Sequence, residues 1–280
     1  MAQYLLGLYE KAMPNQFTLP EKLAAAKKLG YDYVELSIDE SDQKLQRLTW
    51  TKSERLALVK AMYDAALPIR SICLSGHRKY PLGSNDPATV ARSLEIMEQA
   101  IELADDLGVR TIQLAGYDVY YEQGSAETKK RFTENILRST ELAARHGVVL
   151  GFETMETPFM NTVKKAMEYV TLADSSYLTV YPDLGNLTNA AKTYGTSVED
   201  DIRKGKGHLC AMHLKETVPG VFREVPFGTG HVDFPKGIET AWQCGVRRFV
   251  TEMWDVGNGT WEAEIQKAVA MMRQLLDRQG

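Results

Sequence analysis

The sequence predicts an α/β protein folded as a single (β/α)8 barrel, the TIM-barrel architecture. Eight short apolar runs alternate with eight helix-like segments along the 280 residues. Strict alternation favours parallel strands joined by right-handed crossovers, and eight such units is the number that closes a barrel. A doubly wound open sheet would carry a glycine-rich first turn, whereas YEKAMPN (9–15) has no glycine. We therefore expect one domain over residues 1–280.

The first half of the chain has four expected strands, each a short apolar run bounded by turn residues. They span 5–9, 33–38, 69–74 and 110–115. Helices are expected over 19–29, 52–66 and 87–107. Pro20 lies in the first turn of the first helix and Gly30 follows its end, which is the usual punctuation of a helix. Thr51 and Asp86 are suitable N-caps for the other two helices.

The second half repeats the pattern. Strands are expected within 148–156, 178–183, 209–213 and 248–254. Helices are expected over 126–146 and 162–173, within 198–206, from Pro235 to Gly245, and over 261–278. The fifth strand, VVLGFETME, has no helical period, which is typical of a strand buried on both faces of a parallel sheet.

Polar residues follow or end the last four strands. They are Glu153, Asp183, His213 and Glu252. Barrel active sites lie at the C-terminal strand ends, so these side chains can converge. Each alone is more often a helix cap, a surface ion-pair partner or a core histidine. Three converging carboxylates, however, repel one another, and one imidazole does not offset that. We therefore predict a divalent metal site for Zn²⁺, Mn²⁺, Co²⁺ or Mg²⁺.

Basic residues and glycines recur on the same expected face and suit a phosphate group. The candidates are His77, Arg78, Lys215, Arg223, Gly228 and Gly230. Lys215 follows His213 by two, so strand alternation points both side chains the same way. The two glycines precede a helix start after the seventh strand, where barrels often bind phosphate through backbone N–H groups. A solvated loop is the alternative interpretation for the segment around His77.

Composition narrows the class of protein further. The net charge is −4 without a long run of one sign, so neither nucleic acid nor a membrane surface is an expected partner. No apolar run is long enough to span a bilayer, and the N-terminal residues do not resemble a signal peptide. The three cysteines, Cys73, Cys210 and Cys244, form no CxxC pair. They are expected to be reduced thiols in a cytoplasmic protein.

Longer motifs connect the chain to a known family. They are GLYEKAMP (7–14), LGYDYVELSIDESDQKLQRLTW (29–50), SICLSGHRKYPLGS (71–84), TIQLAGYDVYYE (111–122), FETMETPFMN (152–161), YPDLGN (181–186), HLKETVPGVFREVPFGTGHVDF (213–234) and TEMW (251–254). With these motifs the chain resembles the L-ribulose-5-phosphate 3-epimerases (L-xylulose-5-phosphate 3-epimerases) of bacterial L-ascorbate and pentose catabolism, within the xylose-isomerase-like metal-dependent barrels.

The resemblance implies a function for the predicted site. Metal ligands would be Glu153, Asp183, His213 and Glu252, with Glu153 and Glu252 as the two catalytic glutamates. The substrate would be a small sugar phosphate, and the protein would be a homodimer. Relatives that act on unphosphorylated sugars often carry a histidine at the position of Asn186, so their substrate contacts do not transfer to this chain.

The resemblance implies that L-ribulose 5-phosphate and L-xylulose 5-phosphate interconvert through a metal-stabilised enediolate, with the two glutamates as acid and base. Alternatives remain open at this stage. An aldose–ketose isomerase would use the same enediolate chemistry with the proton moved between C1 and C2, and a 3-epimerase of an unphosphorylated ketose would use the same barrel. A sugar-phosphate-binding regulatory barrel is a non-catalytic alternative. A DNA-repair endonuclease on this barrel would need more histidines than the five present and a basic face.

Overall fold

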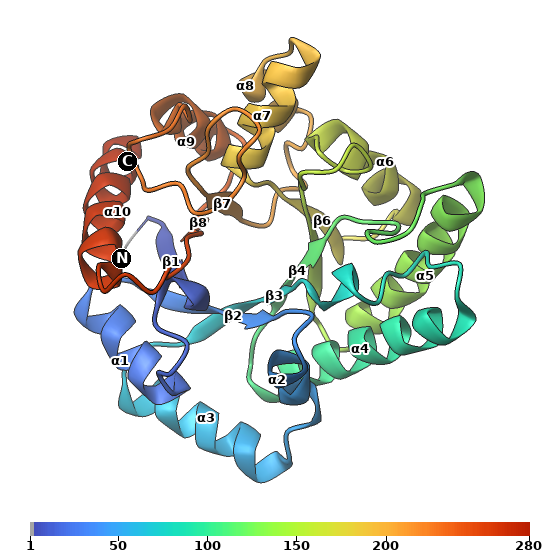
Figure 1. The fold of residues 1–280 in the computed structure, drawn as a ribbon, viewed down its shortest axis with the longest axis horizontal. Helices are drawn as coiled ribbons and strands as arrows, with labels where there is room; N and C mark the ends of the chain where they lie inside the picture. Colours follow the sequence, from blue (N-terminus) through green and yellow to red (C-terminus); the bar gives the residue numbers. More distant parts are fainter. Residues whose placement is uncertain (1–2) are drawn as a thin grey trace.

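Eight parallel strands form the centre of the structure, a computed structural model that describes residues 3–280. The strands are β1 Leu5–Tyr9, β2 Tyr33–Ile38, β3 Ile69–Leu74, β4 Thr111–Ala115, β5 Val149–Glu153, β6 Leu178–Tyr181, β7 Met212–Leu214 and β8 Arg248–Thr251. Their order in the sheet is β6-β5-β4-β3-β2-β1-β8-β7. Helices surround these strands on the outside (Figure 1). The predicted (β/α)8 barrel is therefore confirmed.

The barrel closes between β6 and β7 through irregular pairing. These are the two end strands of the sheet order, and two isolated parallel bridges join them, Val180 to Leu209 and Asp183 to His213. The His213 amide donates to the Pro182 carbonyl at 2.9 Å. The second bridge joins two of the residues predicted to bind metal, so the closing seam of the barrel runs through the candidate site.

The outer layer contains ten α-helices among the described residues. They are α1 Leu19–Lys28, α2 Asp42–Leu45, α3 Lys52–Asp64, α4 Pro87–Asp106, α5 Ala126–Arg145, α6 Val163–Ala173, α7 Leu184–Tyr194, α8 Val198–Arg203, α9 Phe234–Gln243 and α10 Trp261–Leu276. Thr18, Thr51 and Asp86 cap α1, α3 and α4 with their side chains. Thr51 and Asp86 were the predicted caps of those two helices.

Two helices differ from the sequence prediction. The short helix α2 was not predicted. After β6, a helix was expected only within 198–206, where the structure has α8. The additional helix α7, which precedes α8, was not predicted. Asparagine, threonine and glycine make LGNLTNAAKTY a poor intrinsic helix former. Leu184 and Leu187 are nevertheless buried, so tertiary packing outweighs propensity.

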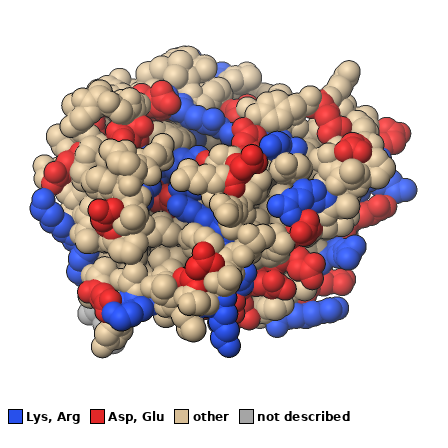
Figure 2. All heavy atoms as spheres, turned by 60° about the horizontal axis from the view of Figure 1, so that its bottom comes forward, with Lys and Arg blue, Asp and Glu red and all other residues tan. Residues whose placement is uncertain are grey.

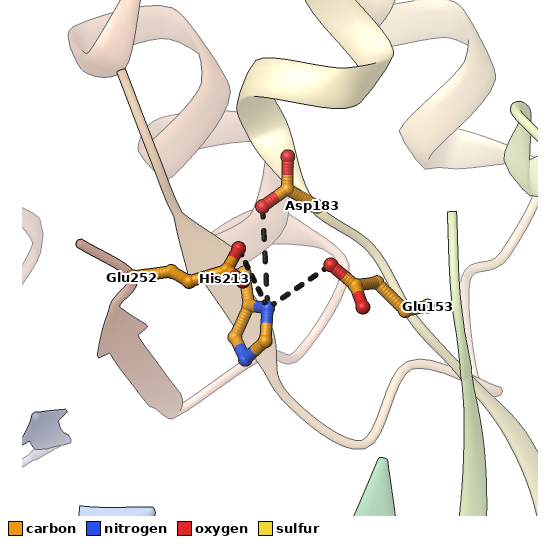
Figure 3. A group of neighbouring side chains, drawn as sticks. All are labelled: Glu153, Asp183, His213 and Glu252. Carbon is orange, nitrogen blue, oxygen red and sulfur yellow. Dashed lines mark hydrogen bonds and ion pairs between the residues drawn. The ribbon is translucent and has the colours of Figure 1, made fainter. Parts of the chain in front are cut away.

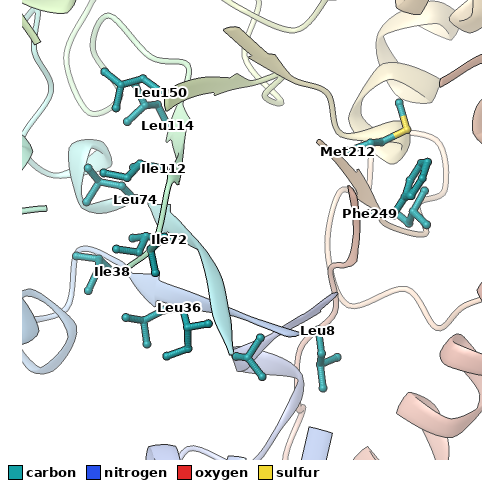
Figure 4. Close-up of a cluster of buried hydrophobic side chains, with 14 of the residues drawn as sticks. Leu8, Leu36, Ile38, Ile72, Leu74, Ile112, Leu114, Leu150, Met212 and Phe249 are labelled. Carbon is teal, nitrogen blue, oxygen red and sulfur yellow. The ribbon is translucent and has the colours of Figure 1, made fainter. Parts of the chain in front are cut away.

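The strands have two differently used faces. Side chains such as Leu8, Leu36, Ile72 and Leu150 point outward and belong to one large apolar cluster between barrel and helices (Figure 4). Alternate positions face the barrel interior, because side chains along a strand point to opposite sides. There Tyr33 joins a second cluster with the residues Tyr9, Cys73, Tyr181, Ala211 and Val250. The barrel interior is therefore packed with side chains.

Glycines face the large interior tyrosines. A Cβ atom on Gly7 would lie 2.4 Å from the Tyr33 ring, and one on Gly151 would lie 3.1 Å from Cβ of Tyr181 and 2.6 Å from Sγ of Cys210. The two strands therefore leave room for aromatic rings that alanine would displace.

A buried carboxylate ties β1 to the first helices. Glu10 is fully buried and forms ion pairs with Lys22, Lys44 and Arg47. It also accepts the Ser37 amide N–H at 2.9 Å. Burial would raise the pKa of Glu10, but Arg47 and the two lysines lower it to about 2. This carboxylate neutralises cations that would otherwise be buried without a partner.

We predict that Glu10→Gln destabilises the protein by about 3–5 kcal/mol, because removing one partner leaves buried charges uncompensated. Denaturant unfolding at pH 7 measures the change. Glu262→Gln is the matched control, since the Glu262–Lys28 pair lies at the surface and such pairs contribute about 0–1 kcal/mol. Equal effects of the two substitutions would contradict the prediction.

Charge on the outer surface is mixed. Acidic and basic side chains alternate over the face in Figure 2, without a broad field of either sign. Among the described residues, every helix is too short or too polar to cross a membrane.

Candidate metal centre and active site

Four of the predicted residues come together at the C-terminal end of the barrel. Glu153 ends β5, Asp183 follows β6, His213 lies in β7 and Glu252 follows β8. Each offers one ligand atom, and these atoms lie within 4.8 Å of one another. Figure 3 shows the three carboxylates directed at one nitrogen of the His213 ring.

That nitrogen is Nδ1 of His213. It lies 3.3 Å from Oε1 of Glu153, 3.3 Å from Oε2 of Glu252 and 4.0 Å from Oδ2 of Asp183. Glu153 and Glu252 approach it from opposite sides (Figure 3). The four side chains thus surround a small polar volume.

Asp183 has two roles in this arrangement. Its Oδ1 accepts the Asn186 N–H at 2.6 Å, so the residue caps the N-terminus of α7. Its Oδ2 faces Lys215, whose ammonium lies 3.3 Å away and 3.2 Å from Oε2 of Glu252. The helix cap fixes the carboxylate, and its free oxygen points into the site.

Burial and charge together perturb these groups. Burial raises the pKa of Asp183 well above its ordinary value and also raises that of Glu153. Burial would raise the pKa of Glu252 too, but Lys215 and His213 hold it well below its usual range. For His213, burial is outweighed by the nearby carboxylates, chiefly Glu35, so its pKa is raised. The pKa of each of these groups therefore depends on the charges of the others.

The donor set fits a divalent cation. The carboxylates Glu35, Glu153, Asp183 and Glu252 are buried around one imidazole and one ammonium. With all four ionised, their negative charge exceeds the positive charge of protonated His213 and Lys215, so a further cation would favour the ionised forms of Asp183 and Glu153, whose pKa values are raised. Oδ2 of Asp183 and Oε2 of Glu252 accept no hydrogen bond from residues 3–280. Carboxylate oxygens with one imidazole nitrogen are a ligand set that divalent Mn, Co, Zn and Mg accept. Both oxygens lack a well-aligned hydrogen bond even though the Lys215 ammonium lies 3.3 Å from one and 3.2 Å from the other. These under-coordinated acceptors and the concentration of carboxylates together point to a metal site.

A small cavity leads from this cluster to the surface. Glu153, Glu252 and Lys215 line its inner part. The other lining residues include Lys11, Arg78, Arg223, Tyr9, Cys73, Ser75, Met155, Glu156, Asn186, Phe222 and Trp254. Three of the predicted basic residues, Arg78, Lys215 and Arg223, therefore lie at the cavity, whereas Lys11 was not predicted.

Glu156 organises the outer part of the cavity. It accepts hydrogen bonds from the hydroxyls of Tyr117 at 2.6 Å and Tyr120 at 3.3 Å, and Nη2 of Arg223 lies 3.5 Å away. The guanidinium of Arg78 stacks over the Tyr120 ring at 5.0 Å. Its Nε is buried and finds no hydrogen-bond partner within the described part of the chain. An unpaired cationic donor thus remains beside the cavity.

Three predicted residues, His77, Gly228 and Gly230, do not line this cavity. His77 is buried away from the cavity, with its Nε2 3.0 Å from the Ser93 carbonyl in α4. Gly228 and Gly230 enclose Glu216 instead of presenting a free anion cradle. The Gly228 N–H donates to Oε2 of Glu216 at 3.0 Å, and a Cβ on Gly230 would lie 2.3 Å from Oε1. The protein's own carboxylate occupies the cradle predicted for a phosphate.

Two interior polar residues were missed by the sequence reasoning. Oε1 of Glu35, in β2, lies 2.6 Å from Nε2 of His213. Gln113, in β4, donates to Oε2 of Glu153. Each is a carboxylate or amide residue at a central position of a mostly apolar strand, YVELSI and TIQLA. That pattern was the available signal, since a polar group at a buried strand position needs a partner.

The cysteines are free thiols. Cys73 and Cys244 are buried, while Cys210 is half-buried. This agrees with the expected reduced state.

Comparison with known proteins defines the class. A family model described as "Xylose isomerase-like TIM barrel" matches residues 23–275. A solved D-psicose 3-epimerase from Clostridium cellulolyticum H10, with D-tagatose, superposes with a TM-score of 0.82 at 18% identity, covering 97% of this chain and 99% of that one. A structure of L-ribulose 3-epimerase gives 0.78 at 20% identity, covering 99% and 95%. These structures share the fold.

Sequence similarity is much stronger to one group within that class. The chain is 43% identical over 279 residues to the L-ribulose-5-phosphate 3-epimerase UlaE of Escherichia coli (strain SMS-3-5 / SECEC), covering 99% of this chain and 97% of the relative. The same identity and coverage hold for UlaE of Escherichia coli O157:H7. The chain therefore belongs to the L-ribulose-5-phosphate 3-epimerase family of xylose isomerase-like TIM barrels, and it is an isomerase.

The buried position of His77 leads to a pH prediction. Burial lowers its pKa from 6.5 to about 4. Between these values the unfolded chain binds a proton that the folded protein excludes, so stability falls as the pH decreases from 6.5 to 4. This shift corresponds to about 3 kcal/mol. We expect His77→Gln, which can still donate to the Ser93 carbonyl, to remove that part of the acid sensitivity.

Denaturant unfolding of both proteins from pH 8 to pH 4 measures this difference. Other titrating groups contribute equally to the two curves, so their difference isolates His77. Parallel curves across the range would show that His77 is not buried in the neutral form.

Proposed function

We propose that the protein interconverts L-ribulose 5-phosphate and L-xylulose 5-phosphate by inverting C3. The observation that carries this proposal is the placement of Glu153 and Glu252 on opposite sides of a buried cluster suited to a divalent ion. The 43% identity to L-ribulose-5-phosphate 3-epimerases supports the choice of substrate.

The reaction is proton abstraction next to a carbonyl. Removing the C3 proton of a 2-keto sugar leaves an enediolate, whose planar carbons can be reprotonated from either face. A divalent ion held by Glu153, Asp183, His213 and Glu252 would supply the positive charge that favours this intermediate. Glu153 would remove the C3 proton of one epimer while Glu252 supplies a proton to the opposite face, and the two roles would be exchanged for the other epimer.

Neighbouring residues hold the two glutamates in place. Gln113 donates to Oε2 of Glu153, while the other oxygen, Oε1, lies 3.3 Å from Nδ1 of His213 in the ligand cluster. Lys215 lies 3.2 Å from Oε2 of Glu252 and balances its charge. A carboxylate with one fixed oxygen loses less freedom when it reaches a productive position, which favours catalysis.

The phosphate would bind at the outer part of the cavity. Lys11, Arg78 and Arg223 line it, and Arg78 has an unpaired donor. Arg223 is the more exposed arginine and its pairing with Glu156 is long, at 3.5 Å. A phosphate oxygen would offer these guanidinium groups a charged acceptor in favourable geometry. Gly228 and Gly230 play no part in this proposal, because Glu216 occupies them.

We predict that Glu153→Gln and Glu252→Gln each reduce turnover by about 10²- to 10⁴-fold, the usual contribution of general acid–base catalysis. In D₂O, a two-base mechanism makes the variants complementary. Each should still exchange the C3 proton of one epimer while losing exchange on the other. NMR of L-ribulose 5-phosphate and L-xylulose 5-phosphate, incubated separately, measures this.

Metal content of each variant is the control, since both glutamates are also proposed ligands. Loss of C3 exchange on both epimers by a variant that retains metal would argue against two bases. Exchange at C1 with formation of an aldose would instead identify an aldose–ketose isomerase. Wild-type protein that binds metal and exchanges neither position would contradict the proposed reaction.

We predict that Arg223→Ala raises KM for L-ribulose 5-phosphate by about ten- to hundredfold, because a hydrogen bond to a charged group contributes about 1.5–3 kcal/mol. The same variant should change the kinetics of unphosphorylated L-ribulose little. Arg203→Ala is the matched control, since Arg203 pairs with Asp200 at the surface. An equal loss on both sugars would place the phosphate elsewhere.

A further inference from the structure

Glu35 lies directly beneath the candidate metal centre. It occupies the middle of β2 and is fully buried. Its Oε1 faces Nε2 of His213 at 2.6 Å. Its Oε2 accepts hydrogen bonds from Oγ of Ser71 at 2.6 Å and from the hydroxyl of Tyr181 at 2.9 Å. Both carboxylate oxygens are therefore engaged, and their donors come from β3, β6 and β7.

The two nitrogens of His213 consequently have different surroundings. Nε2 faces Glu35, while Nδ1 faces Glu153, Asp183 and Glu252. A carboxylate can only accept, so it selects the imidazole tautomer that carries its hydrogen on Nε2. That tautomer leaves the lone pair of Nδ1 directed at the three other carboxylates, where a cation would bind.

We propose that Glu35 is a positioning residue that holds His213 as a metal ligand through Nδ1. It fixes the tautomer, orients the ring and increases the electron density available at Nδ1, as an outer-shell carboxylate does for a metal-bound histidine. Glu35 does not line the cavity, so it acts through His213 and not on the substrate. This inference rests on the metal site of the proposed function but not on the identity of the sugar.

A purely structural role for Glu35 is the alternative. Its hydrogen bonds to Ser71 and Tyr181 would then matter as much as its contact with His213. The two roles can be separated, because Ser71 contacts Oε2 and His213 contacts Oε1. Substitution of Ser71 therefore removes a contact of Oε2 alone, whereas substitution of Glu35 also changes the contact of Oε1 with His213.

The experiment compares wild-type protein, Glu35→Gln and Ser71→Ala. Glutamine keeps the shape of the side chain but removes its charge, and its amide N–H₂ can face Nε2 and favour the opposite tautomer. Co²⁺ affinity is measured by competition with a chelator, and the visible Co²⁺ spectrum reports ligand geometry. NMR of the ring nitrogens in the Zn²⁺-loaded proteins reports the His213 tautomer. All readouts are made without substrate.

We expect Glu35→Gln to bind Co²⁺ about ten- to hundredfold more weakly, the usual effect of removing an outer-shell partner, with a changed spectrum. Ser71→Ala should stay within about fivefold of wild type, since it removes one hydrogen bond that does not reach His213. Wild-type His213 should carry its hydrogen on Nε2.

Three results would overturn the inference. Wild-type affinity and spectrum in Glu35→Gln would show that Glu35 does not position the ligand. Equal weakening by Glu35→Gln and Ser71→Ala would show a structural role only. Wild-type protein that binds no Co²⁺ would remove the metal site itself. A wrong choice of sugar substrate would alter none of these measurements, so failure of the proposed reaction is distinguishable from failure of this inference.

Discussion

The buried negative charge at the C-terminal end of the barrel is the constraint on which the site depends. Four carboxylates, Glu35, Glu153, Asp183 and Glu252, are removed from water around His213 and Lys215. Isolated buried charges are costly, so this cluster requires cations. Lys215 supplies one positive charge to two of the carboxylates, and a divalent ion would supply the remainder. The concentration of negative charge that is unfavourable by itself makes the site suitable for binding a metal ion.

The barrel accommodates this cluster at its closing seam. Regularly paired strands are joined by a continuous ladder of backbone hydrogen bonds. Between β6 and β7, isolated bridges take the place of such a ladder. Asp183 leaves β6 to cap α7, and it still lies opposite His213 in one of those bridges. Fold closure and ligand placement are thus set by the same few residues. Substitutions at this seam would affect barrel closure and ligand placement together. Substitutions of the outward-facing leucines and isoleucines would affect packing alone.

The loops around the cavity differ in how firmly they are held. Glu216 binds the amides of Thr217, Gly228 and Val232, so the end of the β7–α9 loop is fixed from within. Among residues 3–280, Arg223, in the same loop, has only the long contact with Glu156 and the contact with the Trp254 ring at 6.0 Å. An anchored loop with one loosely held arginine allows that side chain to adjust to a substrate. Glu216 thus occupies the backbone amides near Gly228, and Arg223 in the same loop remains able to bind a phosphate group.

The sequence by itself determined the barrel and the four converging polar residues. Both follow from local periodicity: apolar runs mark the strands, capping residues mark the helices, and parallel strands bring their ends to one edge. It did not determine α7, because packing of Leu184 and Leu187 outweighs a poor local propensity. It placed Gly228 and His77 at the site, and only the fold showed Glu216 in the cradle and His77 against Ser93. The contact of Glu35 with His213 joins residues 178 positions apart. Such a pairing depends on where the strands lie around the closed barrel, which no local pattern encodes.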